Sequence, residues 1–231
     1  MVPKGGLEPP RVSPPHLSDF DTPTHASYLD PMHPTIDVTG LLLVGGRSSR
    51  MGRDKAFLPF RGAPIFETVL NALKRHMETV ILVGDRPERF DGYGLTILPD
   101  IFPGSALGGL YTGLQAATTP YVFVAPCDLP FADDGILSYL LSLRKGFDVI
   151  VPSREGCFEP LFAVYSRNCL EPMRDLLDAR NFRIFDFYPR VRVRRVEEDE
   201  LAAISNPRKA FRNVNTAKEY AKLMEELGND R

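Results

Sequence analysis

A short segment rich in glycine and basic residues is the part of this sequence best suited to chemistry on a phosphate. Residues 43–55 contain three glycines, three arginines and one lysine. Glycines let the backbone approach a ligand and expose N–H groups, while arginine and lysine bring charge to a polyphosphate. Neither common nucleotide motif matches, because Arg53 stands where the P-loop lysine would be and no Gly-x-Gly-x-x-Gly occurs. The segment predicts a different phosphate loop; a solvated turn is the simpler alternative.

Two charged side chains are the strongest candidates for catalysis. Lys55 follows the glycine-rich segment and would act as a point charge on phosphate, with Arg50 assisting it. Asp128 follows the apolar run 121–125, and ligands of open α/β sheets bind beyond the carboxyl ends of strands. One carboxylate there suits Mg²⁺, which completes its coordination with substrate phosphates and water. A turn ahead of Pro130 explains Asp128 equally well from the residues alone.

Polar side chains in the second half of the chain form a candidate acceptor site. Asn213 and Asn215 alternate around Val214, so an extended segment would direct both amides to the same side. Side-chain bonds to the local backbone are the alternative explanation for either amide. A basic group in the same half of the chain includes Arg183, which is a further candidate for binding an acceptor phosphate; its other members are Arg180, Arg190, Arg192 and Arg194. Alternating arginines more often form a solvated strand face, and the acidic run 197–200 could neutralise their charge.

The elements that must position these residues alternate between strands and helices. Apolar runs predict strands at residues 39–44, 79–83, 95–98, 121–125 and 148–151, with later strands at 161–165 and 191–196. Helices are predicted at 133–143, at 170–177 and after the capping box of Thr216 and Glu219, with Gly228 as the C-terminal cap. Another buried helix stripe consists of Phe66, Val69, Leu70, Leu73 and Met77. This order predicts an α/β fold: a three-layer α/β/α sandwich with a mostly parallel, Rossmann-like sheet.

Composition limits the domain organisation and the possible partners. Residues 1–36 carry eight of the 21 prolines without periodicity, so we expect a disordered extension followed by a single domain at 37–231; Met32 is a candidate translation start. A net charge of −2 and a pI near 6.1 argue against a nucleic acid or an anionic membrane as partner. Three cysteines, odd in number and without paired spacing, and the lack of a long apolar run predict a soluble, cytoplasmic protein.

Five segments together resemble one family, the molybdenum cofactor guanylyltransferases of the nucleotidyltransferase class. They are residues 43–55, 103–110, 127–131, 159–162 and 211–216, and they occur in the order in which that family has its motifs. The resemblance extends over about residues 38–225. Ser105 and Ala106 replace a more usual proline, Val44 replaces an alanine, and Glu159 is not the commonest residue at its position.

The resemblance implies an activity and assigns residues to it. GMP would pass from GTP to the phosphate of molybdopterin, with Mg²⁺ on Asp128 and with Arg50 and Lys55 as the catalytic cations. The first half of the domain would bind nucleotide and the second half the acceptor, through Arg183, Asn213 and Asn215. A molybdoenzyme apo-protein or its chaperone would then receive the product. The nucleotide would contact Leu43, Val44, Gly45, Gly46, Gly52, Lys55, Asp100, Gly108 and Asp128.

Two other functions are compatible with the same residues. A related enzyme could use CTP, on the same cofactor or on a sugar or alcohol phosphate, although Gly45 with Gly46 and Asp54 before Lys55 resemble the GTP branch. A non-catalytic protein that carries the cofactor is the second alternative. Lys55 and Asp128 argue against a carrier, since a protein that only binds needs no charged groups at a reacting phosphorus.

Overall fold

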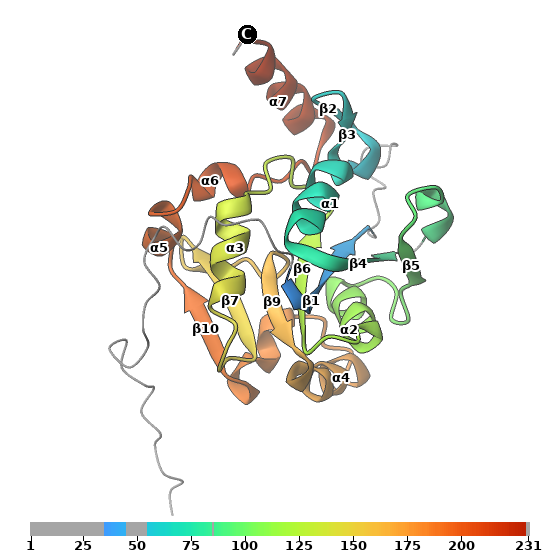
Figure 1. The fold of residues 1–231 in the computed structure, drawn as a ribbon, viewed down its shortest axis with the longest axis vertical. Helices are drawn as coiled ribbons and strands as arrows, with labels where there is room; N and C mark the ends of the chain where they lie inside the picture. The colour runs from blue at the N-terminus through green and yellow to red at the C-terminus, as the bar shows by residue number, and fades with distance from the viewer. Residues whose placement is uncertain (1–34, 45–54, 85, 230–231) are drawn as a thin grey trace, which may run out of the picture.

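The computed structural model describes residues 35–44, 55–84 and 86–229. Within them, eight strands form the main sheet. Seven of them lie in the order β10-β7-β9-β6-β1-β4-β5 (Figure 1), and β8 pairs with β7. The sheet is parallel except at β9, which runs antiparallel to both of its neighbours, and at β8. The strands are β1 (Thr35–Leu43), β4 (Met77–Gly84), β5 (Thr96–Pro99), β6 (Tyr121–Pro126), β7 (Val149–Arg154), β8 (Cys157–Phe158), β9 (Ala163–Ser166) and β10 (Val193–Val196).

Helices cover both faces of this sheet. Successive residues of β1 point to opposite faces, so Leu42 packs in one apolar cluster with α1 and α3, while Leu41 and Leu43 pack in another with α2 and α4. The larger helices are α1 (Ile65–His76), α2 (Ala106–Ala116), α3 (Asp134–Ser142), α4 (Leu170–Asp178) and α7 (Ala217–Asn229). The three-layer α/β/α sandwich predicted from the sequence is therefore confirmed.

Short elements complete the chain. A hairpin of β2 (Pro59–Phe60) and β3 (Ala63–Pro64) lies beside α7 (Figure 1), where the Tyr220 hydroxyl donates to the carbonyl oxygen of Pro59 at 2.5 Å. The remaining pieces are η3 (Lys55–Phe57), η4 (Pro87–Phe90), η5 (Arg167–Cys169), η6 (Ile184–Arg190), α5 (Glu198–Ala202) and α6 (Pro207–Ala210). Across the described ranges, no helix is both long and apolar enough to cross a bilayer.

The boundaries of several predicted elements need correction. β1 begins at Thr35, inside the predicted extension of residues 1–36, because Thr35 pairs with Met77 at the start of β4. Met77 was predicted as the last residue of a buried helix stripe, but it is extended and begins β4, because α1 ends at His76. The capping box is confirmed, since Thr216 and Glu219 each accept the other's backbone N–H. Gly228 lies inside α7 and is not its cap.

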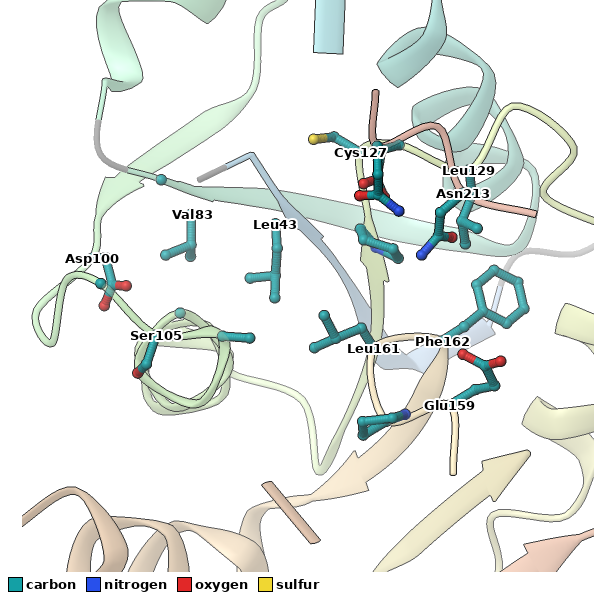
Figure 2. Close-up of a pocket in the computed structure, with 18 of the residues that line it drawn as sticks. Leu43, Val83, Asp100, Ser105, Cys127, Leu129, Glu159, Leu161, Phe162 and Asn213 are labelled. Atoms are coloured by element: carbon teal, nitrogen blue, oxygen red, sulfur yellow. The ribbon is translucent and has the colours of Figure 1, made fainter. Parts of the chain in front are cut away.

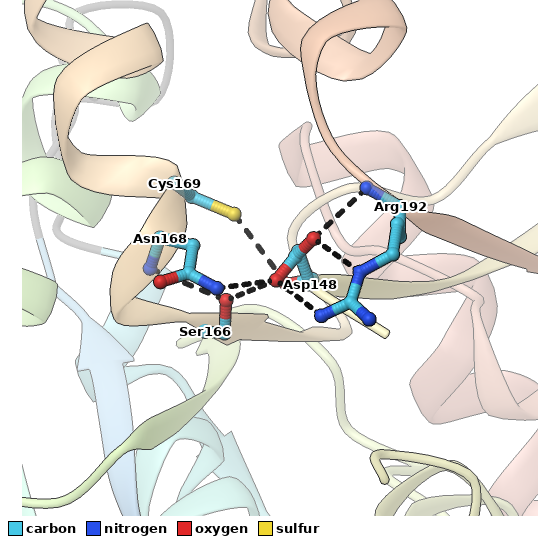
Figure 3. Close-up of polar contacts among 5 residues, drawn as sticks. All are labelled: Asp148, Ser166, Asn168, Cys169 and Arg192. Atoms are coloured by element: carbon cyan, nitrogen blue, oxygen red, sulfur yellow. Dashed lines mark hydrogen bonds and ion pairs between the residues drawn. The ribbon is translucent and has the colours of Figure 1, made fainter. Parts of the chain in front are cut away.

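A buried carboxylate ties three segments together at the amino end of β7. The side chain of Asp148 is 8% exposed and lies between Arg192 on one side and Ser166 with Asn168 on the other (Figure 3). It accepts from Arg192 Nε at 3.1 Å, from Asn168 Nδ2 at 2.8 Å and from Ser166 Oγ at 3.1 Å. Burial opposes ionisation, but these donors together outweigh it and lower the pKa of Asp148 to about 2.

Asp148→Asn should destabilise the protein by about 2 kcal/mol at pH 7, as expected when a pKa falls from 3.8 to about 2 on folding. Because the folded pKa is the lower one, this stability is present above pH 4 and is lost as the pH falls toward 2. Urea unfolding of both proteins should therefore show a gap at pH 7 that narrows below pH 4. Asp175→Asn, which affects an exposed pair with Arg190, is the control and should change little. Equal effects of the two substitutions would contradict the prediction.

Candidate active site at the carboxyl edge of the sheet

A cleft of about 800 Å³ lies where the parallel strands of the sheet end. Leu43 closes β1, Gly84 closes β4 and Pro126 closes β6, and all three residues line it. β9 runs in the opposite direction, so the segment before it reaches the same edge. The other lining residues are Val83, Asp100, Pro103, Gly104, Ser105, Ala106, Gly109, Cys127, Asp128, Leu129, Glu159, Pro160, Leu161, Phe162, Phe211, Asn213 and Asn215.

The order of the strands divides the cleft into two halves. β6 lies between β9 and β1, so Asp128, just past β6, separates the residues that precede β9 from those that follow β4 and β5. Figure 2 shows Asp100 and Ser105 on one side of Leu43, with Glu159 and Asn213 on the other. One ligand group can therefore occupy each side, with Asp128 between them.

The first half of the cleft is built around the start of α2. Ser105 caps this helix by accepting from the backbone N–H of Gly108 at 3.0 Å, and it lines the cleft together with Ala106. The partial positive charge of a helix N-terminus favours an anionic group there. Gly109 also lines the cleft, with its Cα toward the side chain of Leu43. The half is suited to the sugar and phosphates of a nucleotide.

Asp100 and Gly108 support this half through the loop between β5 and α2. The Asp100 carboxylate accepts from the backbone N–H of Phe102 at 2.8 Å and from Thr112 Oγ1 at 3.1 Å. A Cβ at Gly108 would collide with the carbonyl oxygen of Phe102, so only glycine allows this approach. Gly108 does not line the cleft, whereas its neighbour Gly109 does. Gly108 thus packs against Phe102 in the loop, and its contact with nucleotide stays a prediction.

Asp128 lies at the junction of the two halves. Its backbone is fixed on both sides, because Cys127 N–H donates to the carbonyl oxygen of Leu43 at 3.2 Å and Val214 N–H donates to that of Asp128 at 3.2 Å. Burial raises the pKa of the Asp128 carboxyl, and the positive charge of Lys55 only partly opposes this. A carboxylate that is costly to ionise in the free protein will gain from any cation that binds beside it.

The segment that follows α6 brings two amides to Asp128. Val214 is 1% exposed while Asn213 and Asn215 are exposed and line the cleft, as the alternation in the sequence predicts. Lys55 Nζ donates to Asn215 Oδ1 at 2.9 Å, which joins residues 160 positions apart in the chain. Glu219 holds the backbone of Asn215 by accepting its N–H at 2.6 Å. Lysine, aspartate and two amides thus converge in one place.

The remaining predicted site residues lie elsewhere or outside the described ranges. Val44 lies just past β1 and does not line the cleft, and its N–H donates to the carbonyl oxygen of Val83. Arg183 is exposed at the start of η6, with its guanidinium over the ring of Phe185, and the structure does not bring it to the cleft. Four predicted residues lie outside the described ranges: Gly45, Gly46, Arg50 and Gly52.

Three other arginines of the predicted basic group are accounted for by ion pairs. Arg190 pairs with Asp175 at 2.8 Å, Arg192 with Asp148 at 3.1 Å and Arg194 with Glu200 at 2.5 Å. The last of these partners belongs to the acidic run 197–200, whose neutralising role is confirmed. For these three arginines, the alternative explanation, in which their charges are neutralised by acidic side chains and bind no acceptor, therefore holds.

Of the neighbouring glycines 108 and 109, only Gly109 faces the cleft, and the helix start fixed by Ser105 decides between them. Glu159 is a cleft residue to which the sequence assigned no role. Glu159 is preceded by a two-residue strand too short to give periodicity, and its pairing with Arg154 across the β7–β8 turn could not be read from spacing. Its unusual residue type within the motif was the available signal.

The donor atoms around Asp128 fit a hard divalent cation. Mg²⁺ prefers oxygen ligands and commonly takes only one or two protein carboxylates, the rest being phosphate and water. The Asp128 carboxylate and the amide oxygen of Asn213 are such donors, whereas the amide oxygen of Asn215 accepts from Lys55 Nζ. In the described part of the chain, no three His, Cys, Asp or Glu side chains gather as a closed metal site. An open site completed by substrate is the arrangement that these residues allow.

The fold and the cleft define the class: an α/β nucleotidyltransferase with its site at the carboxyl edge of the sheet. Residues 40–193, more than half of the chain, match the family model described as the MobA-like NTP transferase domain. The chain therefore belongs to this family, as the motifs of the sequence indicated.

Curated relatives and a solved structure agree with this membership. The chain is 36% identical over 188 residues to a probable molybdenum cofactor guanylyltransferase of Pelotomaculum thermopropionicum, covering 81% of this chain and 92% of the relative. It is 32% identical to a molybdenum cofactor guanylyltransferase of Desulfosudis oleivorans, covering 80% and 93%. The crystal structure of molybdopterin-guanine dinucleotide biosynthesis protein A from Archaeoglobus fulgidus shares the fold, with a TM-score of 0.72, 21% identity and coverage of 83% and 99%.

Proposed function

We propose that this protein transfers GMP from GTP to the terminal phosphate of molybdopterin, releases pyrophosphate and so forms the guanine dinucleotide form of the cofactor. The observation that carries the proposal is the position of Asp128, Asn213 and Asn215 between the halves of one cleft, with Lys55 bonded to Asn215 and its charge acting on Asp128 although it does not itself line the cleft. The names of the curated relatives support the choice of substrates.

The reaction forms one bond and breaks another at the α-phosphorus of GTP. An oxygen of the acceptor phosphate attacks this phosphorus, and the bond to the oxygen bridging to the β-phosphate breaks, so that pyrophosphate leaves. A phosphate monoester has a second pKa of about 6 and is largely ionised at pH 7, so it needs no strong general base. What the protein must supply is position and charge.

The chain's own residues provide both. Lys55, held by Asn215, places an ammonium group beside Asp128, where negative charge builds up on the α-phosphate. Asn213 offers a neutral amide to the acceptor phosphate from the same edge. A Mg²⁺ ion held by Asp128 would neutralise phosphate charge when bound. The start of α2 orients the nucleotide on the other side.

A nucleotide panel tests the proposed function. Pyrophosphate release should be measured with Mg²⁺, molybdopterin and each of ATP, GTP, CTP and UTP in turn. Release with GTP alone is the expected result, and it should stop when EDTA removes the metal. Release with CTP would indicate the cytidylyltransferase alternative, and no release with any nucleotide would indicate a carrier. Omitting molybdopterin is the control for simple hydrolysis of GTP.

The product of the proposed reaction needs a recipient. A dinucleotide cofactor must be passed to an apo-protein that uses it, so a molybdoenzyme or its chaperone is the expected partner. The cytoplasm, where such apo-proteins fold, is the expected compartment.

A further inference from the structure

A third carboxylate of the cleft besides Asp100 and Asp128, that of Glu159, lies in the half opposite Asp100. It belongs to the segment between β8 and β9 and lines the cleft beside Pro160 and Leu161. Figure 2 shows it near Phe162 and on the same side of the cleft as Asn213. The strand order puts this segment on the far side of Asp128 from the nucleotide half. Glu159 is therefore placed to meet the acceptor.

The neighbours of Glu159 hold it in place. Arg154 Nε donates to Glu159 Oε1 at 3.1 Å, and Arg154 is itself fixed by donating from Nη1 to the carbonyl oxygen of Pro207 at 3.3 Å. The Arg154 guanidinium lies over the ring of Phe211, 5.3 Å from its centroid, and Phe211 packs edge-on against Phe162. A side chain held this firmly presents its carboxylate at little entropic cost.

The carboxylate nevertheless has capacity for a ligand. Burial raises the pKa of Glu159, and the Arg154 charge opposes this only in part. Among the described residues, the side chain of Glu159 makes one hydrogen bond, at Oε1, which leaves Oε2 and the second lone pair of Oε1 as acceptors. A partly desolvated carboxylate gains most from N–H donors that arrive with a bound molecule.

The surroundings of Glu159 indicate the shape of that molecule. Pro160, Leu161 and Phe162 form an apolar wall beside the carboxylate, which suits a flat heterocycle with donors along one edge. The aminopyrimidinone edge of a pterin carries an exocyclic amine next to a ring N–H, and a carboxylate accepts such a pair side by side.

From this geometry we propose that Glu159 binds the aminopyrimidinone edge of the acceptor's pterin and so determines acceptor specificity. The proposal rests on the proposed function for the identity of the acceptor. It makes Glu159 a specificity residue of the second half of the cleft and gives it no part in binding GTP.

Glu159→Gln is the variant that tests the proposal, since it keeps the shape and removes the charge. The KM for molybdopterin should rise about 10- to 100-fold, as expected for losing hydrogen bonds to a charged group, while the KM for GTP changes less than twofold. Glu155→Gln is the matched control, because Glu155 is exposed at the nearby β7–β8 turn and does not line the cleft. An unchanged KM for molybdopterin, or an equal rise in both constants, would overturn the proposal.

A binding measurement separates this proposal from the proposed function. The intrinsic fluorescence of 6-hydroxymethylpterin and of 6-hydroxymethyl-lumazine, which has an oxo group in place of the amine, should be titrated with each protein. The wild type should prefer the pterin by about tenfold, and Glu159→Gln should lose this preference. The same affinity for both probes in the wild type would overturn the role of Glu159, even in an active enzyme. The preference without any turnover of GTP would leave Glu159 in place and reject the transfer reaction.

Discussion

Replacing Asp128 with asparagine should nearly abolish nucleotidyl transfer and at the same time make the free protein more stable. The loss of activity should be about 100- to 1000-fold in kcat, as for other losses of a group that organises charge in the transition state. The gain in stability follows from burial, which raises the pKa of the Asp128 carboxyl. A neutral amide of the same shape avoids the cost of keeping that charge in a partly buried position.

The stability difference between the wild type and Asp128→Asn should depend on pH. Because the folded pKa of Asp128 is raised, the group favours the folded state most below its unfolded pKa, and that contribution is lost as the pH rises through the folded value. At pH 7 the ionised side chain therefore costs stability, and Asp128→Asn should have the higher melting temperature. The difference should disappear near pH 4. Thermal melts without metal or nucleotide at both pH values measure it.

Asp134→Asn is the control with the opposite sign. Burial also opposes the ionisation of Asp134, but His76 and Arg75 outweigh it and lower the pKa of this carboxyl. Loss of the charge should therefore lower the melting temperature at pH 7 and leave activity intact, since Asp134 does not line the cleft. If Asp128→Asn instead lowered the melting temperature, Asp128 would be a stabilising residue of the fold. It would then not be an active-site carboxylate that lowers the stability of the free protein.

Those features of the site that depend on a single strand or on one short segment could be predicted from the sequence. Asp128 directly follows an apolar strand, so its place at the edge of the sheet required only the α/β pattern. Asn213 and Asn215 share a side because Val214 between them is buried, a matter of simple alternation. The layers followed from strands that are apolar on both faces, as Leu41 and Leu42 illustrate.

The features that depend on tertiary packing could not be predicted. Whether Gly108 or Gly109 faces the cleft depends on the rotation of α2 against β1, which is set by contacts far apart in sequence. Arg183 has the charge expected at an acceptor site, but charge alone does not place a side chain, and η6 directs it elsewhere. The bond between Lys55 and Asn215 closes a loop of 160 residues, a distance beyond the reach of any local pattern.

Lys55→Met should lower kcat for nucleotidyl transfer by about 100- to 1000-fold with a smaller change in the KM for GTP, because its charge matters most when the transition state forms. Lys218→Met, in an exposed position on α7, is the control and should keep full activity. A raised KM with an unchanged kcat would mean that Lys55 only holds the triphosphate in the ground state.

Stability measurements on the same variant show whether Lys55 acts on Asp128 in the folded protein. The Lys55 charge lowers the pKa of Asp128, so its loss makes the ionised carboxylate still more costly and should lower the melting temperature at pH 7. In the Asp128→Asn background the same substitution should cost much less, because no carboxylate remains to be balanced. A double-mutant cycle measures this coupling, and strictly additive effects would mean that the two charges do not act on each other. If the two substitutions are coupled in their effect on stability and each alone lowers kcat, Lys55 and Asp128 act as one charged pair. This pair lowers the stability of the free protein and is retained because the reaction requires it.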